Sequence, residues 1–203
     1  MNIVLDIGNV ICYWQPQRLV ASVFPHEVEQ RVALEAVIQQ EDWLDLDRGK
    51  LDLDTAIDKA HHRSSLPRAQ IAALYHAVPE HLAPIPAMVT AIEELAKAGV
   101  PLYILSNMHR HAWLQLQETH DFWQWFRGTL VSCEVGCIKP EPEIFALLCE
   151  RFQLHPGGTV FFDDMAENVA AAQEFGLRAE QVVDPEGGAA LVYKVLETVG
   201  AAR

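Results

Sequence analysis

Short apolar runs alternate with amphipathic stretches over the second half of the chain. The runs predict buried β-strands, and the amphipathic stretches, with apolar residues three and four positions apart, predict helices. The strands are expected at 100–105, 129–132, 159–162 and 179–183. The helices are expected at 86–99, from after the first of these strands to about 118, at 140–152, up to 174, and at 189–199. This alternation predicts an α/β fold with a Rossmann-like, doubly wound parallel sheet.

The first ten residues predict one more strand. Apolar residues lead to Asp6 and then Gly8, which is typical of a buried strand that delivers a carboxylate to the carboxyl edge of a sheet. The alternative is that Asp6 only caps a turn formed by Gly8 and Asn9. Complementary groups at the ends of the other strands decide between these readings.

The segment between this strand and the helix at 86–99 has helical periodicity throughout. Helices are expected around 18–24, 26–40, 54–62 and 67–76. We therefore predict a core of residues 1–13 and 84–203 and a helical cap of residues 14–83, inserted after the first strand. A cap inserted there is expected to cover the carboxyl edge of the sheet as a lid.

Composition excludes several classes of protein. The chain has 203 residues, 50% of them hydrophobic, and a formal net charge of −13. This charge argues against nucleic acid or an anionic membrane as a partner, since both require a basic surface. No signal peptide or apolar run of membrane-spanning length is visible, so a cytoplasmic protein is expected. The four cysteines lack the spacing of a zinc site and are expected to be reduced thiols.

Four of the predicted strand ends carry groups that suit one chemistry. They offer Asp6, then Ser106 with Asn107, then Lys139, then Asp163 with Asp164. Parallel strands place their carboxyl ends at one edge, so these residues are expected to converge. Carboxylates suit Mg²⁺, which commonly bridges protein carboxylate and substrate phosphate. The set predicts a site for a divalent metal and a phosphoryl group.

These motifs resemble, in order and spacing, those of the haloacid dehalogenase superfamily. They stand here as 4–10 around Asp6, Leu105-Ser106-Asn107, Lys139-Pro140, and 161–164 followed by Asn168. The resemblance covers the whole chain. It implies a Rossmann-like core with a helical cap, Mg²⁺ as cofactor, and an aspartate that attacks phosphorus to form an aspartyl-phosphate.

The resemblance also implies a role for each residue. Asp6 is the nucleophile and a metal ligand, the Gly8 carbonyl and Asp164 are further metal ligands, and Lys139 acts in catalysis. Ser106, Asn107 and Lys139 hold the phosphoryl group. Asp163, Asn168 and Arg110 are expected to support the residues that touch metal and substrate.

One departure from the family pattern concerns the general acid. The usual motif has a second aspartate two residues after the nucleophile, where this chain has Gly8. General acid–base catalysis contributes about 10²–10⁴ in rate. The same departure occurs in a branch that this chain resembles, which contains bacterial α-glucose-1-phosphate phosphatase. A sugar 1-phosphate has a comparatively acidic leaving group, so a small phosphorylated metabolite is the expected substrate, with sugar 1-phosphates first.

Two alternatives remain open. A dehalogenase of this superfamily also uses an aspartate nucleophile, but it has a bulky aromatic residue where Gly8 stands and lacks the aspartate pair at 163–164. The other alternative is a phosphate-binding or partner-binding protein without turnover, for which Gly8 is the only support.

Several further side chains are expected to be structural. His61, His62, His109 and His111 are interpreted as surface or cap residues, since an oxygen-ligand site is already present. Trp43 is expected to pack in the cap, with Arg48 in the same segment, which could face the substrate.

Overall fold

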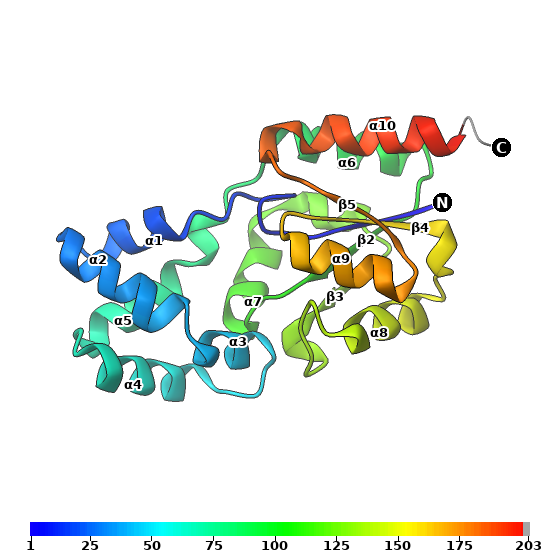
Figure 1. Cartoon of the computed structure of the whole chain (residues 1–203). Coiled ribbons are helices and arrows are strands. Elements are labelled where there is room, and N and C mark those ends of the chain that lie inside the picture. The colour runs from blue at the N-terminus through cyan, green and yellow to red at the C-terminus, as the bar shows by residue number, and fades with distance from the viewer. Residues whose placement is uncertain (201–203) are drawn as a thin grey trace.

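The computed structural model describes residues 1–200 and contains a parallel sheet flanked by helices (Figure 1). Its five strands lie in the order β3-β2-β1-β4-β5. They are β1 (Asn2–Leu5), β2 (Leu102–Ser106), β3 (Gly128–Val131), β4 (Thr159–Asp163) and β5 (Arg178–Gln181). The first strand is central, and the chain adds strands first on one side of it and then on the other. The predicted doubly wound α/β fold is therefore confirmed.

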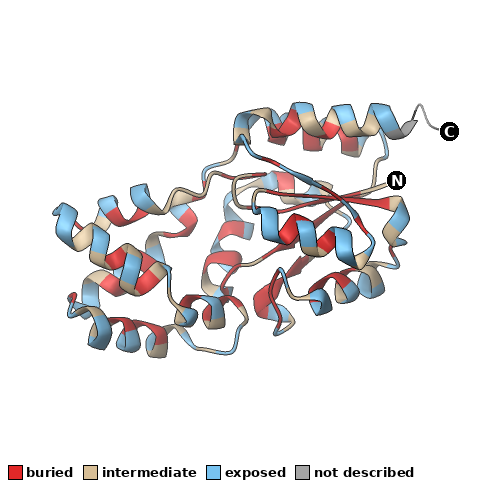
Figure 2. Cartoon of the chain, in the orientation of Figure 1, coloured by how far each residue is buried: buried red, intermediate tan, exposed pale blue. Residues whose placement is uncertain are grey.

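Alternate side chains of the strands enter two separate hydrophobic cores. Ile3 and Leu5 of β1 pack into one core, and Val4 between them packs into the other. The first core is covered by α6 (Pro86–Lys97), α7 (Arg110–Thr119) and α10 (Gly188–Gly200), and the second by α8 (Pro142–Phe152) and α9 (Ala166–Phe175). Figure 2 shows the buried inner faces of these helices against the largely buried strands. The sheet is thus a rigid platform for residues at its edge.

The segment between β1 and α6 is helical and lies to one side of the sheet (Figure 1). It contains α1 (Pro16–Val23), α2 (Glu27–Ala33), α3 (Glu41–Asp47), α4 (Leu53–Ser64) and α5 (Arg68–Ala77). We call these five helices the cap helices. The single helix expected over 26–40 is instead α2 followed by a wider π-helical turn, Leu34–Ile38. The helix α3 was not predicted, and the cap limits 14–83 stay a prediction.

Two chain segments connect the sheet to the cap helices, and they pair with each other. The backbone N–H of Tyr13 donates to the carbonyl of Ala83 at 2.9 Å, and the N–H of Ile85 donates to Ile11 at 2.9 Å. Cys12 and Pro84 form an antiparallel bridge between these bonds. The outgoing and returning segments are therefore one two-stranded connection.

The loop that carries Lys139 is longer than expected. A helix was predicted from Pro140, but α8 begins at Pro142. Glu141 closes a turn before it, since its N–H donates to the Ile138 carbonyl at 2.9 Å and its carboxylate accepts from the Ile138 N–H at 3.1 Å. Lys139 therefore lies in a hydrogen-bonded loop at the sheet edge.

Two other expectations concern the whole chain. All four cysteines are free thiols, and Cys12, Cys133 and Cys137 are buried. Among residues 1–200, the helices are all too short or too polar to cross a membrane.

Candidate active site

The sheet brings the predicted groups to one edge. β1 lies between β2 and β4, with Leu5 beside Ile104 on one side and beside Phe162 on the other. The residues that follow or end these strands, Asp6, Ser106 and Asp163, are therefore neighbours. The three residues therefore converge at one edge of the sheet, as expected for the ends of parallel strands.

Lys139 joins three of these strand ends. Its ammonium group donates to Asp163 at 2.6 Å and to the Leu105 carbonyl at 3.2 Å, and it forms an ion pair with Asp6 at 2.9 Å. The side chain is almost completely buried. Burial lowers the pKa of the ammonium group, but the charges of Asp163 and Asp6 outweigh burial and raise it. Lys139 is therefore a fixed positive charge inside the site.

Both carboxylate oxygens of Asp163 accept hydrogen bonds from the protein. One carboxylate oxygen accepts from the Met165 N–H at 2.8 Å and from the Asn168 amide at 2.9 Å, and the other accepts from Lys139. The residue is fully buried. Asp163 and Asn168 thus lie where the predicted supporting role requires, because they orient Lys139.

Asp6 and Asp164 have more freedom to bind a cation. Carboxylate oxygens of Asp6, Asp163 and Asp164 all lie within 4.8 Å of one another. The Asn9 amide donates to one oxygen of Asp164 at 2.9 Å, which leaves the other oxygen available. Gly8 lines the same cavity. Carboxylate and carbonyl oxygens form a donor set that suits Mg²⁺.

Asn9 is a positioning residue that the sequence did not single out for this role. Its backbone φ is 52°, a left-handed conformation that asparagine tolerates better than most residues. While its amide nitrogen holds Asp164, its amide oxygen accepts from the Trp14 N–H at 2.9 Å. Asn9, expected from the sequence to be a turn residue, therefore also ties the motif around Asp6 to the motif that contains Asp164.

The carboxyl of Asp6 is strongly affected by its surroundings. Burial raises its pKa to about 7, although Lys139 lowers it; Asp163 adds to the rise, and the Ser106 hydroxyl opposes it. The Ile7 N–H donates to one carboxyl oxygen at 2.7 Å. A bound cation would favour the ionised form, which is the nucleophilic one.

Asn107 fixes the loop that carries Lys139. Its amide nitrogen donates to the Lys139 carbonyl at 2.9 Å, and its amide oxygen accepts from the Lys139 N–H at 2.8 Å. Because the side chain is occupied, the backbone N–H of Asn107 is the group left for a phosphoryl oxygen. Ser106 is buried beside Asp6 and lines the same cavity.

A cavity of about 560 Å³ extends from these residues to the cap helices. Its walls include polar groups at the sheet edge and a large apolar part. The apolar side chains are Trp14, Ile38, Trp43, Leu44, Val78, Leu82, Met108, Ile138 and Met165. Trp43 is buried as expected, and it stacks on Tyr75 with ring centres 5.1 Å apart. A ligand in this cavity would touch both the sheet edge and the cap helices.

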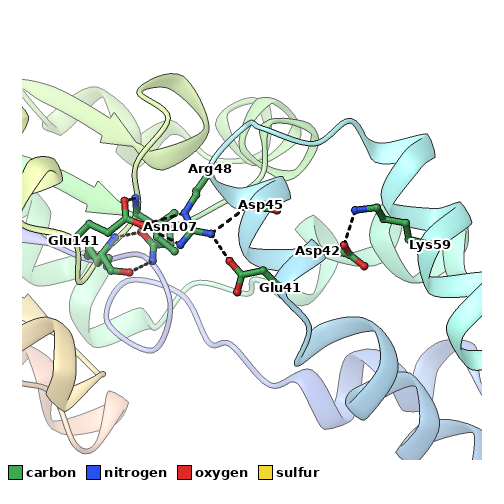
Figure 3. A network of polar contacts seen from close by, with 9 residues as sticks. Glu41, Asp42, Asp45, Arg48, Lys59, Asn107 and Glu141 are labelled. Atoms are coloured by element: carbon green, nitrogen blue, oxygen red, sulfur yellow. Dashed lines mark hydrogen bonds and ion pairs between the residues drawn. The ribbon is translucent and has the colours of Figure 1, made fainter.

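Two polar links hold α3 against the sheet edge. Arg48 pairs with Glu141 at 2.9 Å and with Glu41 and Asp45 on α3, as Figure 3 shows. The Ser132 hydroxyl donates to the Asp47 carbonyl at 2.6 Å and accepts from the Met108 N–H at 3.0 Å. The end of α3 is therefore fixed close to the residue that follows Asn107.

His109 and Arg110 follow Asn107 at the start of α7. His109 was expected at the surface or in the cap, but it is buried in the core beside the cavity, where its Nδ1 accepts the Ala112 N–H at the start of α7. This correction follows from its position at a helix start directly after β2. Arg110 donates to the Cys133 carbonyl at 3.1 Å and is not among the residues that line the cavity.

Asp47 is a cavity residue that the sequence analysis missed. It lines the cavity from α3 and is buried. The cap segment around Trp43 and Arg48 had been noted, but an aspartate within an acidic stretch gives no signal of burial. Its neighbours in sequence, Asp45 and the pair Glu41 and Asp42, are ordinary charged residues of a short helix.

Comparisons with known proteins agree with this geometry. The family described as haloacid dehalogenase-like hydrolase matches residues 2–176. The sesquiterpene phosphatase astK of Aspergillus oryzae is 29% identical over 184 residues, which cover 89% of each protein. The family match spans the four motifs.

Solved structures show the same fold. A haloacid dehalogenase family enzyme of Bacteroides thetaiotaomicron, in complex with magnesium and inorganic phosphate, has a TM-score of 0.71 at 21% identity, covering 89% of this chain and 92% of that one. L-2-haloacid dehalogenase of Xanthobacter autotrophicus has a TM-score of 0.66 at 20% identity, covering 89% and 76%. With a family match over most of its length and these folds, the chain belongs to the haloacid dehalogenase-like hydrolases.

Proposed function

We propose that the chain is a magnesium-dependent phosphatase that hydrolyses small phosphate monoesters through an aspartyl-phosphate on Asp6. The observation that carries this proposal is the group at the sheet edge. Lys139 bridges Asp6 and Asp163 there, and a carboxylate oxygen of Asp164 lies within 4.8 Å of one from each of them. A relative that is a sesquiterpene phosphatase and a fold relative solved with magnesium and phosphate support the same reading.

Each residue has a task in this reaction. A carboxylate oxygen of Asp6 attacks phosphorus, and the ester oxygen of the leaving group departs. Lys139, the Ser106 hydroxyl and the Asn107 N–H hold the phosphoryl oxygens and stabilise the charge that they carry. Asp6, Asp164 and the Gly8 carbonyl would hold Mg²⁺, which supplies further positive charge to the phosphoryl group when bound.

The same cluster argues against carbon–halogen cleavage. Attack of an aspartate on the carbon of a haloacid needs no divalent cation, so a carboxylate such as Asp164, held by Asn9 with one oxygen free, has no task in that reaction. The sequence departure at Gly8 points the same way. The likeness to L-2-haloacid dehalogenase of Xanthobacter autotrophicus, at 20% identity, shows the fold alone.

Two substrate classes deserve a direct comparison. Sugar 1-phosphates follow from the sequence, since their leaving group needs little protonation. Phosphates of apolar alcohols are the second class, and the specific observation in their favour is the apolar wall that Trp14, Ile38 and Leu82 contribute to the cavity. The name of the sesquiterpene phosphatase relative agrees with the second class.

A screen of phosphate monoesters with Mg²⁺ tests the proposal. We expect phosphate release that stops when a chelator removes Mg²⁺ and returns when Mg²⁺ is restored. Asp6→Asn should lower turnover by at least about 10³, because the nucleophile is lost. Asp121→Asn, at an exposed residue that does not line the cavity, is the matched control. Retained activity in Asp6→Asn would rule out the covalent mechanism, and halide release from haloacids without metal would favour the dehalogenase.

Binding without turnover is the remaining alternative. A phosphoryl analogue that binds with Mg²⁺, together with no phosphate release across the screen, would favour a phosphate-binding protein. The screen also orders the substrate classes, since kcat/KM for a sugar 1-phosphate and for the phosphate of an apolar alcohol are measured side by side.

A further inference from the structure

The proposed reaction needs a proton donor for the leaving group, and Gly8 cannot supply one. A donor must lie in the same cavity as Asp6 and must carry a proton that other groups do not already hold. Besides Asp6, the ionisable residues that line the cavity are Asp47, Arg48, His109, Lys139, Glu141, Asp164 and Glu167. These residues differ in their contacts and in whether they carry a proton that they can donate.

The residues at the sheet edge are already occupied. The Lys139 ammonium group contacts Asp6, Asp163 and the Leu105 carbonyl, and its raised pKa means that it keeps its proton. Asp164 belongs to the group proposed to bind metal. Neither residue is therefore available to protonate an ester oxygen.

The pair formed by Arg48 and Glu141 is also committed. Arg48 donates to Glu141 through two nitrogens, at 3.1 and 2.9 Å. The hydrogen bond from the Ile138 N–H and the one from Arg48 lower the pKa of Glu141 despite partial burial, so it carries no proton at neutral pH. Glu167 is exposed to solvent at the start of α9.

His109 is neutral and inaccessible. Its Nδ1 accepts a hydrogen bond, so its proton lies on Nε2, and that atom is buried with no partner among the described residues. Burial lowers the pKa of the ring to about 3, with His111 and His76 adding to the effect. A neutral imidazole N–H is a poor acid at this position, so His109 does not meet the requirement.

Asp47 meets it. The residue is only 6% exposed and contributes to the cavity wall. Burial raises the pKa of its carboxyl to about 8, although the His109 N–H, the Trp43 side chain and the charge of Arg48 all lower it. At neutral pH this carboxyl is a neutral acid with one proton to donate.

The position of Asp47 relative to the phosphoryl site is fixed through the backbone. Its carbonyl is linked by the Ser132 hydroxyl to the N–H of Met108, the residue after Asn107. Its carboxyl interacts with the N–H of His109, the next residue along. The carboxyl therefore packs against the loop that follows Ser106 and Asn107, the residues proposed to bind the phosphoryl group. It approaches this loop from the side of the cap helices. A leaving group directed to the cap would depart from this side.

We propose that Asp47 is the general acid–base of this enzyme and takes the place of the aspartate that Gly8 lacks. The proposal rests on the phosphatase function proposed above. In the first step an Asp6 oxygen bonds to phosphorus, the bond from phosphorus to the ester oxygen breaks, and that oxygen takes the Asp47 proton to leave as an alcohol. In the second step the Asp47 carboxylate accepts a proton from water as the water oxygen bonds to the same phosphorus. The bond from phosphorus to the Asp6 oxygen breaks, which releases phosphate and restores both side chains.

A leaving-group series tests this role in Asp47→Asn, which keeps the size of the side chain. The value of kcat/KM reports only the steps up to phosphorylation of Asp6, so it isolates the acid function. For an alkyl phosphate, we expect kcat/KM to fall by about 10²–10⁴. For p-nitrophenyl phosphate, whose leaving group needs little protonation, we expect a fall of about tenfold or less.

The controls separate this proposal from failure of the phosphatase function. Wild-type hydrolysis of p-nitrophenyl phosphate, lost in Asp6→Asn, establishes the phosphatase. Asp121→Asn should leave both kcat/KM values within about twofold, since Asp121 is exposed and does not line the cavity. An equal fall for both esters in Asp47→Asn, or no fall for the alkyl phosphate, would overturn the acid role while the phosphatase function stood.

A second variant tests whether an aspartate at position 8 can replace the Asp47 carboxyl. A side chain at Gly8 has room, because a Cβ there would lie 3.6 Å from the Trp14 Cβ, an ordinary contact. Gly8→Asp combined with Asp47→Asn should recover at least tenfold of the alkyl phosphate activity, and Gly8→Asn in the same background should not. Equal activity in the two double variants would count against a missing proton donor.

The wild-type pH profile provides a test that needs no variant. The ionisable groups facing Asp47 are Arg48, His109, Tyr75 of α5 and Cys133. Burial raises the pKa of Tyr75 and raises that of Cys133 to about 11, so these neighbours keep one charge state between pH 6 and 9. We expect kcat/KM for the alkyl phosphate to fall above about pH 8, with a weaker fall for p-nitrophenyl phosphate. Identical alkaline limbs for both esters would overturn the proposal.

Discussion

Asp47 and His109 are buried side by side where the cap helices meet the sheet edge, and burial keeps both of them neutral. The carboxyl retains its proton because its pKa is raised to about 8, and the imidazole loses its second proton because its pKa is lowered to about 3. Desolvation is the largest cause in each case, and it acts in opposite directions on an acid and a base. A neutral pair of this kind costs less to bury than two charges.

The first prediction concerns stability and pH. The Asp47 carboxyl has an ordinary pKa of 3.8, so the folded chain binds one more proton than the unfolded chain between about pH 4 and 8, and stability must fall as pH rises through this range. His109 has the opposite effect, but only below its ordinary pKa of 6.5. From pH 6.5 upward Asp47 acts together with Asp6, whose pKa is also raised, to about 7, so the contribution of Asp47 is isolated by comparing wild type with Asp47→Asn.

Thermal unfolding of wild type and Asp47→Asn measures this effect. Over 1.5 pH units the wild type should lose up to about 2 kcal/mol relative to the variant, or about 4–8 °C in Tm for a chain of this size. The Tm of the variant should approach or exceed that of the wild type at pH 8. Parallel Tm curves for the two proteins would show that the carboxyl is already ionised when folded.

At the scale of elements, strand ends were more predictable than the cap. An apolar run that stops at a polar residue indicates both a buried parallel strand and its functional end, so Asp6, Ser106 and Asp163 could be placed from sequence alone. Their contacts fit the roles that the family resemblance implies, and those roles stay predictions. Lys139 was expected at a helix start and lies instead in a loop closed by Glu141.

The residues missed by sequence analysis owe their positions to tertiary contacts. α3 is a short helix with acidic residues in its first turn, and its periodicity alone does not distinguish it from a polar loop. Asp47 is held in its buried position by Ser132, 85 positions away in sequence, which binds its carbonyl. Asn9 adopts its left-handed turn in partnership with Asp164, which is 155 positions away. Local sequence carries no signal for such pairings.

The link between α3 and the sheet gives a prediction for Ser132→Ala. The hydroxyl satisfies a buried carbonyl and a buried N–H, so its removal should cost about 1–3 kcal/mol in the free energy of unfolding. Because Asp47 would also lose its fixed position, kcat/KM for an alkyl phosphate should fall more than that for p-nitrophenyl phosphate. Urea denaturation and the two kinetic values measure the effects.

Thr119→Ala is the control for this experiment. The Thr119 hydroxyl donates only to the Leu116 carbonyl within its own helix, at 2.7 Å. Its loss should be smaller, and the ratio of kcat/KM between the two esters should not change. If Ser132→Ala left that ratio unchanged, the hydroxyl would serve stability alone.

At the scale of the whole molecule, charge opposes the proposed substrate. The formal net charge is −13, and a phosphate monoester is an anion. The positive charge of Lys139 is matched by two carboxylates, and that of Arg48 is matched by Glu141, Glu41 and Asp45. The approach of substrate from solution is therefore repulsive.

This repulsion predicts the effect of salt. Raising ionic strength from 0.01 to 0.15 M shortens the screening length from about 30 to about 8 Å, so kcat/KM should rise a few-fold at saturating Mg²⁺. The value of kcat should stay nearly constant, because the bound substrate is shielded from bulk ions. Steady-state kinetics with a monovalent salt measures both quantities, and a fall in kcat/KM would indicate that a local positive field governs capture.

The paired connection between sheet and cap helices has a consequence for catalysis. Two separate linkers would let the cap helices twist and slide, but segments hydrogen-bonded to each other, at Tyr13 to Ala83 and at Ile85 to Ile11, bend together. We expect the cap helices to rotate as a rigid body about a single hinge axis at this connection. The contacts of Asp47 with Ser132 and of Arg48 with Glu141 would break on opening and re-form on closure, which would return Asp47 to the same place in the cavity. A proton donor carried on a moving part can therefore be as reproducibly placed as one built into the sheet.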